Sequence, residues 1–305
     1  MGGAMSRHRR HGPRRLGWTM AGTTPPDDPG TQRRPRSPLR FFVLVFALST
    51  PFWLLGAVTS RQLSADLPVS SFIWICPVIA AAILAYRENG TAGVTELLRR
   101  SFDYKRISAK IWYAPVILLP PAVYALTYGV MWLLGLPLPT VQFPVLAALG
   151  LFLGYFIAAQ CEELGWSGYA LDPLQARWNA LQAGLLLGLV WAAFHYVPLL
   201  QHGRSAGWIA WWSLGTVAFR VLFTWLYNNT GNSVFAAALF HTMGNLSQVG
   251  PFLDFGPGGY PYDAQRISAL ILASVAAIVT VVWGPRTLAR HARPRRGVTA
   301  GGHGG

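Results

Sequence analysis

The segment LQAGLLLGLVWAAFHYVPLL at residues 181–200 decides the fold class of this chain. It carries no Asp, Glu, Lys or Arg, and it is as long as the roughly 20 apolar residues that a helix needs to cross a bilayer. His195 stands within it, and an ionisable group at membrane depth is costly and usually functional. The segment therefore predicts a membrane-spanning helix that carries a functional side chain.

Apolar runs recur on both sides of this segment. They occupy residues 41–58, 70–86, 112–136, 143–160, 208–227, 234–246 and 267–283. The run at 234–246 is the shortest and the most polar of them. Together the runs predict an all-α fold, a polytopic membrane protein of about eight transmembrane helices.

The composition agrees with a chain that is largely buried in lipid. Hydrophobic residues make up 52% of it and charged residues 12%, whereas soluble domains carry about 25% charged residues. Cys76 and Cys161 lie in separate apolar runs, so they give neither a disulfide framework nor a paired zinc-type spacing.

The lysines and arginines predict the orientation, because cytoplasmic loops carry an excess of them. With an inward N-terminus and eight spans, 21 of the 25 lie in inward segments and three in outward loops. Both termini are therefore expected to be cytoplasmic, in a multi-pass protein of the cell inner or plasma membrane, with the lipid bilayer as a partner. The net charge of +14 then reflects topology, and nucleic acid is not an expected partner.

Two basic tails are expected to flank a transmembrane domain of residues 38–284. Residues 1–37 are rich in Arg, Pro, Gly and Thr without an apolar period, which predicts a disordered tail. Residues 285–305 form a second tail, basic and rich in Gly. Within the domain, residues 91–106 mix apolar and basic side chains and fit either a short helix on the inner interface or an ordinary basic loop.

Five ionisable side chains adjoin or lie within the apolar runs. They are Glu162, Glu163, His195, Arg220 and His241. Because each is expensive there, the set indicates a functional site; the alternative is that the groups pair only to hold helices together.

The spacing of neighbouring residues refines this set. His241 and Asn245 are four residues apart and share a helix face, so Asn245 can orient the imidazole or donate to an oxyanion. Trp191 and His195 have the same spacing, which places an aromatic ring beside that histidine.

Small residues at a spacing of four precede both groups. Gly150 and Gly154 precede the glutamates, and Gly184 and Gly188 precede His195. Such pairs let helix backbones approach closely, so we expect them to bring the carboxylates toward the imidazole. One conflict of depth stands against this expectation. His195 lies about 21 Å along its helix from the start of the run, whereas the glutamates follow a run that ends at residue 160.

A carboxylate and two imidazoles support two hydrolytic routes. The carboxylate can act as a general base on water while a histidine shares or relays the proton. Alternatively Glu162, His195 and His241 can bind a zinc ion with an open fourth position. The His-Glu-x-x-His motif is absent, so a metal site would have to be built across helices. Because Cys161 adjoins the glutamate pair, a cysteine protease that uses Cys161 and His195 is another possibility, but a buried small residue is the simpler interpretation.

Three stretches together carry a family resemblance. They are EELGWSGY at 162–169, WAAFHYVP at 191–198 and HTMGN at 241–245. This order resembles the CAAX-protease and bacteriocin-processing family of intramembrane proteases, whose motifs are Glu-Glu-x-x-x-Arg, Phe-x-x-x-His and His-x-x-x-Asn. The stretch FRVLFTWLYNNTGNS at 219–233 also looks like the segment that precedes the third motif, so the resemblance covers a protease-like core at about 145–250.

The resemblance implies an eight-helix intramembrane endopeptidase whose active site opens toward the cytosol. It implies that Glu162 and His195 activate the attacking water, that His241 and Asn245 stabilise the oxyanion, and that Glu163 is a supporting carboxylate. No cofactor is then required, with zinc as the alternative. The substrate would be a peptide or membrane protein, since relatives trim prenylated CAAX proteins or act in peptide processing and bacteriocin self-immunity. The oligomeric state stays open.

Two positions depart from the family motifs. Ser167 stands where the family has Arg, and Trp191 stands where it has Phe. Our hypothesis is that Arg220 supplies the missing charge, to the carboxylates or to a substrate. The loss of the motif arginine also keeps open a non-catalytic scaffold or bacteriocin-immunity partner with the same fold. A small-solute transporter is less favoured, because no inverted repeat is visible.

Overall fold

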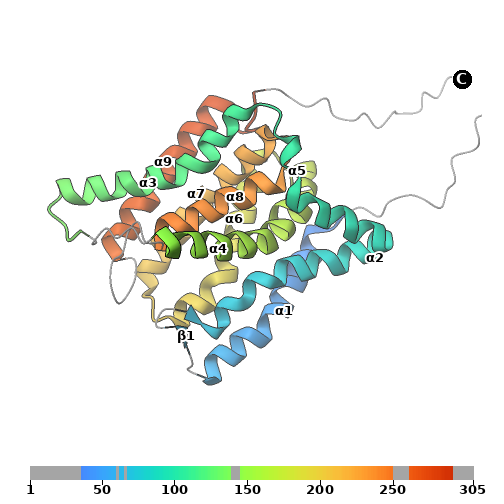
Figure 1. Ribbon diagram of the computed structural model, residues 1–305, viewed down its shortest axis with the longest axis horizontal. Coiled ribbons are helices and arrows are strands. Elements are labelled where there is room, and N and C mark those ends of the chain that lie inside the picture. The colour runs from blue at the N-terminus through green and yellow to red at the C-terminus, as the bar shows by residue number, and fades with distance from the viewer. Residues whose placement is uncertain (1–35, 60–61, 65–66, 139–144, 250–260, 291–305) are drawn as a thin grey trace, which may run out of the picture. The chain divides into compact units, whose positions relative to one another are not determined.

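A computed structural model describes residues 36–59, 62–64, 67–138, 145–249 and 261–290. The described chain is helical apart from one short β-ribbon (Figure 1). The α-helices are α1 Pro38–Thr59, α2 Cys76–Arg99, α3 Tyr113–Leu133, α4 Val145–Gly165, α5 Asp172–Arg177, α6 Ala180–Gln201, α7 Ala206–Asn229, α8 Val234–Val249 and α9 Tyr262–Trp283. The 3-10 segments are η2 Val69–Ile75, η3 Arg100–Phe102, η4 Tyr104–Arg106 and η5 Lys110–Trp112; η6 Trp166–Leu171 is a π-helix, and the strands are β1 Gln62–Ser64 and β2 Leu67–Pro68.

The prediction of an all-α, multi-pass membrane protein is confirmed. Seven helical stretches of the described chain are long and apolar enough to cross a bilayer. The predicted span at 234–246 corresponds to α8, whose 16 residues measure about 24 Å against a hydrocarbon core of about 30 Å. Most of its apolar side chains are buried by other helices, so α8 belongs to the interior of the bundle. The cytoplasmic placement of the termini stays a prediction, and both predicted tails lie largely outside the described residues.

The helix that carries the glutamates is much longer than the sequence predicts. It runs without interruption from Val145 to Arg177, 33 residues, through α4, η6 and α5. The predicted end at residue 160 is therefore wrong, because the polar residues that follow it continue the helix inside the bundle. Glu162 consequently lies near the middle of a continuous helix, and the conflict of depth with His195 disappears.

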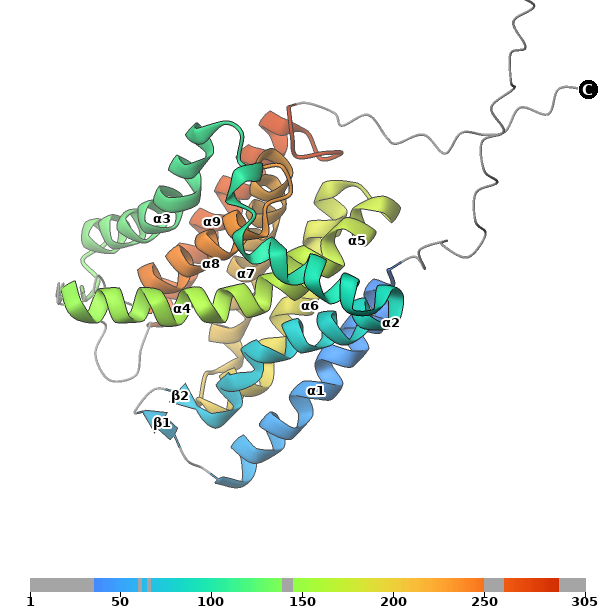
Figure 2. The same ribbon diagram turned by 45° about the vertical axis from the view of Figure 1, so that its right-hand side comes forward.

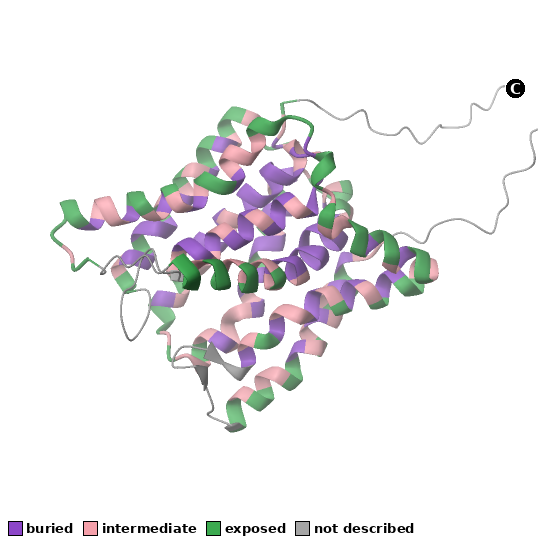
Figure 3. Ribbon diagram, in the orientation of Figure 1, coloured by how far each residue is buried: buried purple, intermediate pink, exposed green. Residues whose placement is uncertain are grey.

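The interior of the bundle is formed by α6, α7, α8 and the second half of α4. α7 packs against α6 and α9, and α8 packs against α3 and α4. Figures 1 and 2 show α1 and α2 on one side of α4, and α3 and α9 on the other. Buried residues concentrate in this centre, whereas the first half of α4 exposes apolar side chains such as Leu146 (Figure 3), as expected for a surface in contact with lipid.

The two small-residue pairs do not act as predicted. An added Cβ at Gly184 or Gly188 would approach α7 to 2.9 Å, at Thr224 and Val217 respectively. A Cβ at Gly150 or Gly154 would meet no atom of the described residues within 4 Å. The close contact therefore joins α6 to α7, and the pair on α4 does not bring the carboxylates toward the imidazole.

The carboxylate helix instead makes its close approach at Gly165. An added Cβ there would lie 2.7 Å from the backbone oxygen of Pro77 in α2. This contact fixes α4 against α2 within one turn of the glutamates. The sequence signal for it was a single glycine with no repeat.

The basic segment that follows the second predicted span is helical in its first part. Residues 91–99 form the end of α2, which agrees with the prediction of a short helix there, and a break at Gly90 (φ 60°) separates them from the first part of α2.

Residues 285–290, beyond α9, pack on the bundle. The Ala180 amide donates to the Arg286 carbonyl at 3.0 Å, which pairs an otherwise unbonded N–H at the start of α6.

Candidate active site

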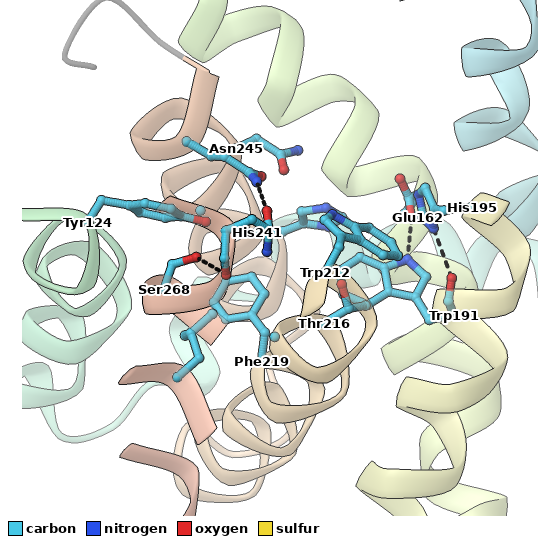
Figure 4. A pocket seen from close by; sticks show the side chains of 15 residues that line it. Tyr124, Glu162, Trp191, His195, Trp212, Thr216, Phe219, His241, Asn245 and Ser268 are labelled. Carbon is cyan, nitrogen blue, oxygen red and sulfur yellow. Dashed lines mark hydrogen bonds between the residues drawn. The ribbon is translucent and has the colours of Figure 1, made fainter. Parts of the chain in front are cut away.

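A cavity of about 180 Å³ lies among α3, α4, α6, α7, α8 and α9 (Figure 4). Its lining includes five of the predicted site residues. They are Glu162, Trp191, His195, His241 and Asn245. Glu163 and Arg220 are not among the lining residues; they lie buried behind the cavity wall. The three motifs therefore meet at one place, although they are far apart in the sequence.

Glu162 presents a carboxylate that is oriented by two neutral donors. Its Oε2 accepts hydrogen bonds from the indole nitrogens of Trp191 at 2.8 Å and Trp166 at 3.3 Å. Trp166 lies one turn further along the same helix, and Trp191 comes from α6. Within the described chain both bonds end on Oε2, so Oε1 keeps its lone pairs. Both donors are neutral indole N–H groups, so neither hydrogen bond forms an ion pair with the carboxylate.

His195 is held in one tautomer by its own helix. Its Nδ1 lies 2.8 Å from the carbonyl oxygen of Trp191, one turn earlier. A carbonyl oxygen only accepts, so Nδ1 must carry the proton and donate. In the neutral imidazole, Nε2 is then unprotonated and can take up a proton. The side chain lines the same cavity as Glu162.

Trp191 connects the polar groups of the site. Its ring meets the imidazoles of His195 and His241 edge to face, with centroids 5.6 and 5.2 Å apart. The guanidinium of Arg220 lies 4.1 Å from the same ring, within the range of a cation–π contact. Trp191 thus contacts three charged or titratable side chains and also donates a hydrogen bond to the Glu162 carboxylate. Phenylalanine, the family residue at this position, has no N–H to donate to Glu162.

Glu163 has an environment opposite to that of its neighbour. Its Oε2 accepts from Arg220 Nη1 at 2.8 Å and its Oε1 accepts from Arg220 Nη2 at 3.0 Å. Oε1 also accepts from His241 Nδ1 at 3.1 Å, and the Ser167 hydroxyl donates to Oε2. Glu163 and Arg220 have no exposed surface. A carboxylate with both oxygens bonded to a buried cation is suited to positioning its neighbours.

The missing motif arginine has a structural counterpart. Ser167 is buried and hydrogen-bonded to Glu163, while Arg220 of α7 lies within 2.8 Å of the same carboxylate. The ion pair of Glu163 is thus formed with a residue of another helix, between α4 and α7. The hypothesis placed Arg220 beside a carboxylate or a substrate, and the structure places it on Glu163, away from the cavity lining.

His241 faces two ways. Its Nδ1 donates to Glu163, and the side chain also lines the cavity. Because Nδ1 carries the proton that is donated to Glu163, donation to a substrate oxygen from Nε2 requires the imidazolium form. Asn245, one turn further along α8, lines the cavity with an amide that can donate without a change of charge.

The alternative chemistries find less support in this geometry. Among the described residues no three His, Cys, Asp or Glu side chains are grouped as metal ligands, so Glu162, His195 and His241 do not fit a three-ligand zinc site. Cys161 is a free, half-buried thiol that is not among the residues lining the cavity.

Part of the site was not predicted. Trp166 supplies the second hydrogen bond to Glu162, and the far end of the cavity is lined by Tyr124, Gln248, Gln265 and Ser268. Two of these come from α9, outside the motif-bearing stretch. The only sequence signal for them is a polar residue near the end of an apolar run.

Two comparisons with known proteins agree with the motifs. Residues 144–247 match the family described as Type II CAAX prenyl endopeptidase Rce1-like. A protein of Methanococcus maripaludis described as CAAX prenyl protease 2 is 28% identical over 237 residues, which cover 70% of this chain and 84% of the relative. The matched family region contains all three motifs.

The fold is that of a multi-pass membrane protein, and both comparisons are with proteases of the CAAX type, a class of hydrolases. Residues 144–247 are similar to the Rce1-like Type II CAAX prenyl endopeptidases in particular, and the resemblance drawn from the motifs is confirmed.

Proposed function

We propose that this protein is an intramembrane endopeptidase in which Glu162 and His195 activate a water molecule. One observation carries the proposal. Glu162, His195, His241 and Asn245 line one cavity, while Glu163 beside them is bonded to Arg220 behind its wall. The arrangement provides a base, a proton carrier and two oxyanion donors at a single place.

The first step adds water to the substrate. Glu162 takes a proton as an O–H bond of the water breaks, and the water oxygen bonds to the carbonyl carbon of the peptide. The carbonyl electron pair moves onto oxygen and forms an oxyanion. Asn245 and the imidazolium form of His241 donate hydrogen bonds to this oxyanion. Such donors act most strongly in a site from which bulk water is excluded.

The second step breaks the peptide bond. The oxyanion re-forms the carbonyl, the C–N bond breaks, and the departing nitrogen takes up the proton that the base removed from water. His195 can carry this proton because its Nε2 is unprotonated in the tautomer fixed by Trp191. The products are a carboxylic acid and an amine, and the carboxylate and imidazole return to their starting forms. No step is assigned to a metal ion.

Glu163 and Arg220 act as positioning residues in this scheme. Glu163 holds His241 through Nδ1, and Arg220 holds Glu163 while its guanidinium lies over the ring of Trp191. Trp191 in turn orients both Glu162 and His195. The pair therefore acts on the reacting groups only through their neighbours.

We further propose that the reaction takes place near the cytoplasmic face, on a peptide or membrane protein. The placement rests on the lysine and arginine distribution, and a topology reporter fused after Arg290 tests it. Prenylated CAAX substrates are suggested by the name of the Methanococcus maripaludis relative.

A substrate screen tests the proposal. Purified protein in lipid nanodiscs is incubated with membrane peptides, prenylated and unmodified, and the products are identified by mass spectrometry. Cleavage by the wild type that is lost in Glu162→Gln supports the endopeptidase. Peptide binding without cleavage in both proteins would instead favour the non-catalytic scaffold or immunity partner.

A further inference from the structure

The carboxylate helix changes its winding directly after the two glutamates. α4 ends at Gly165, and the next six residues form the π-helix η6, Trp166–Leu171. A π-helix bonds each carbonyl to the N–H five residues later, and it is a rare conformation that occurs frequently at functional sites. All six residues are buried. The contacts that hold this unusual turn therefore bear on the carboxylates beside it.

The first residues of η6 bond to both glutamates. The Trp166 indole donates to Glu162 Oε2 at 3.3 Å, and the Ser167 hydroxyl donates to Glu163. The Trp166 ring also packs edge to face against Phe194 of α6, with centroids 5.4 Å apart. The conformation of η6 thus determines how the Glu162 carboxylate is oriented.

The Gly168 carbonyl cannot find its donor at the π-helical position. Its partner there would be residue 173, and Pro173 has no N–H. Two arginines from other parts of the chain donate to this oxygen instead: Arg100 Nη1 at 2.6 Å and Arg36 Nη1 at 3.3 Å. Arg100 therefore makes the shorter of the two bonds that satisfy the carbonyl.

Arg100 also connects η6 to two other helices of the site. Its Nη2 donates to the Tyr227 hydroxyl of α7 at 2.7 Å and to the Asn232 carbonyl, just before α8, at 2.8 Å. Hydrogen bonds from a cation are roughly twice as strong as neutral ones, and this side chain is only 11% exposed. Arg100 thus holds η6 against the helices that carry Arg220 and His241.

Asp103 supplies a nearby negative charge and extends the contact along α8. Its Oδ2 lies 3.9 Å from Arg100 Nε. The same carboxylate accepts from the Ser233 hydroxyl at 2.7 Å and from the amides of Val234 and Phe235 at 3.2 and 3.1 Å. These bonds cap otherwise unpaired N–H groups in the first turn of α8. One arginine and one aspartate therefore join η6 to the start of α8.

We propose that Arg100 is a positioning residue for peptide hydrolysis: it supplies the donor that Pro173 lacks, and it thereby holds η6 in the conformation in which Trp166 bonds to Glu162. Arg100 is not among the residues that line the cavity, so it acts through Trp166 and not on the substrate. The proposal rests on the endopeptidase function and adds to it a residue outside the three motifs.

The kinetics of Arg100→Met test the proposal with the full-length protein in nanodiscs and a membrane peptide that the wild type cleaves. We expect kcat to fall about 10- to 100-fold with little change in KM, because small displacements of reacting groups slow the chemical step. Arg99→Met, at the exposed arginine next in the chain, is the matched control and should keep the wild-type kcat. Wild-type kcat in folded Arg100→Met would overturn the proposal.

A second substitution separates positioning from a general loss of stability. Pro173→Ala restores an N–H five residues after Gly168, so Arg100→Met/Pro173→Ala should regain much of the lost kcat. The double variant still lacks the bonds to Tyr227 and Asn232, so a loss caused by those contacts would not be relieved. Pro173→Ala alone should remain close to the wild type. A kcat that stays as low in the double variant as in Arg100→Met would overturn the role assigned to the Gly168 carbonyl.

The indole N–H signal of Trp166 reports the same geometry without a substrate. It is identified in the NMR spectrum of protein labelled with ¹⁵N-tryptophan as the signal that Trp166→Phe lacks. We expect Arg100→Met to shift it and Arg99→Met to leave it in place. If no peptide is cleaved, the endopeptidase function fails separately and this signal decides the present question, since an unchanged position in Arg100→Met would overturn the proposal.

Arg100→Lys replaces Arg100→Met in both measurements if the methionine variant does not fold. Lysine keeps a positive charge beside Asp103, but its single ammonium group cannot reproduce the planar fork that bonds Gly168, Tyr227 and Asn232 together. We therefore expect a folded protein with a lowered kcat and a shifted Trp166 signal. Wild-type values of both in Arg100→Lys would contradict the positioning role.

Discussion

Arg220 bonds Glu163 through both terminal guanidinium nitrogens, at 2.8 and 3.0 Å, and neither side chain has exposed surface. Glu162, the preceding residue, receives only two indole hydrogen bonds and lines the cavity. Two adjacent carboxylates thus have different environments, one in a buried ion pair and one with only neutral donors. Titratable groups in such different environments commonly take different roles in one reaction. The contact also explains how the charge of Glu163 is neutralised in a chain that has Ser167 in place of the motif arginine: Arg220 supplies the positive charge.

Removal of Arg220 should destabilise the fold. Arg220→Met leaves the Glu163 charge buried without a cation, and breaking a buried pair from one side costs about 3–5 kcal/mol. The double variant Arg220→Met/Glu163→Gln removes the charge as well and should regain much of that loss. Thermal unfolding in detergent, followed by tryptophan fluorescence, measures both. Equal stability of the single and double variants would show that the ion pair is not the relevant interaction.

The two small-residue pairs provide a matched test of helix packing. Gly188→Ala adds a methyl group 2.9 Å from the Val217 Cα of α7, so backbone must shift at an expected cost of about 1–3 kcal/mol. Gly154→Ala is the control, because no described atom lies within 4 Å of its added methyl group. The unfolding temperatures of both variants, measured in the same detergent, show whether the added methyl group destabilises the protein only at position 188. A loss at Gly154 as large as that at Gly188 would contradict the packing described here.

The oxyanion donors should affect turnover more than binding. Asn245→Leu removes a neutral donor from the cavity and should lower kcat by about 10²–10³-fold with little change in KM. His241→Gln retains an amide donor and should be less impaired than His241→Leu. Steady-state kinetics on a cleaved peptide measure each effect. A change confined to KM would assign Asn245 to ground-state binding instead.

Activity is expected to survive metal removal. The described residues offer no three-ligand group of His, Cys, Asp or Glu for a metal ion. Exhaustive dialysis against a chelator should therefore leave the rate unchanged, with less than stoichiometric metal by elemental analysis. Loss of activity that added zinc restores would support the metal route through Glu162, His195 and His241.

The sequence predicted which polar residues gather in and behind the cavity better than it predicted the packing that holds them. Charged and imidazole side chains in or beside apolar runs are rare because they are costly, so Glu162, Glu163, His195, Arg220 and His241 could be identified from their positions in the sequence. The spans followed from hydropathy, since lipid leaves the backbone few alternatives to a helix.

Other features depend on contacts that a single sequence does not display. The end of the carboxylate helix was placed too early, because polar residues inside the bundle resemble a loop. Gly150 and Gly154 match the same spacing as Gly184 and Gly188, yet only the second pair meets a neighbouring helix. Gln265 lines the cavity because α9 packs beside it, and no sequence motif predicts that packing.

The central claim is that Glu162 removes a proton from water, and Glu162→Gln tests it most directly. The amide keeps the size of the side chain and can still accept from Trp191, but it cannot take up the proton. Glu96→Gln, an exposed position on α2, makes the same chemical change outside the cavity. Both variants should show the unfolding temperature of the wild type.

The measurement is kcat/KM on a membrane peptide that the wild type cleaves. Glu162→Gln should lower it by about 10²–10⁴-fold, the usual contribution of a general base, while Glu96→Gln leaves it unchanged. Wild-type activity in folded Glu162→Gln would contradict the mechanism.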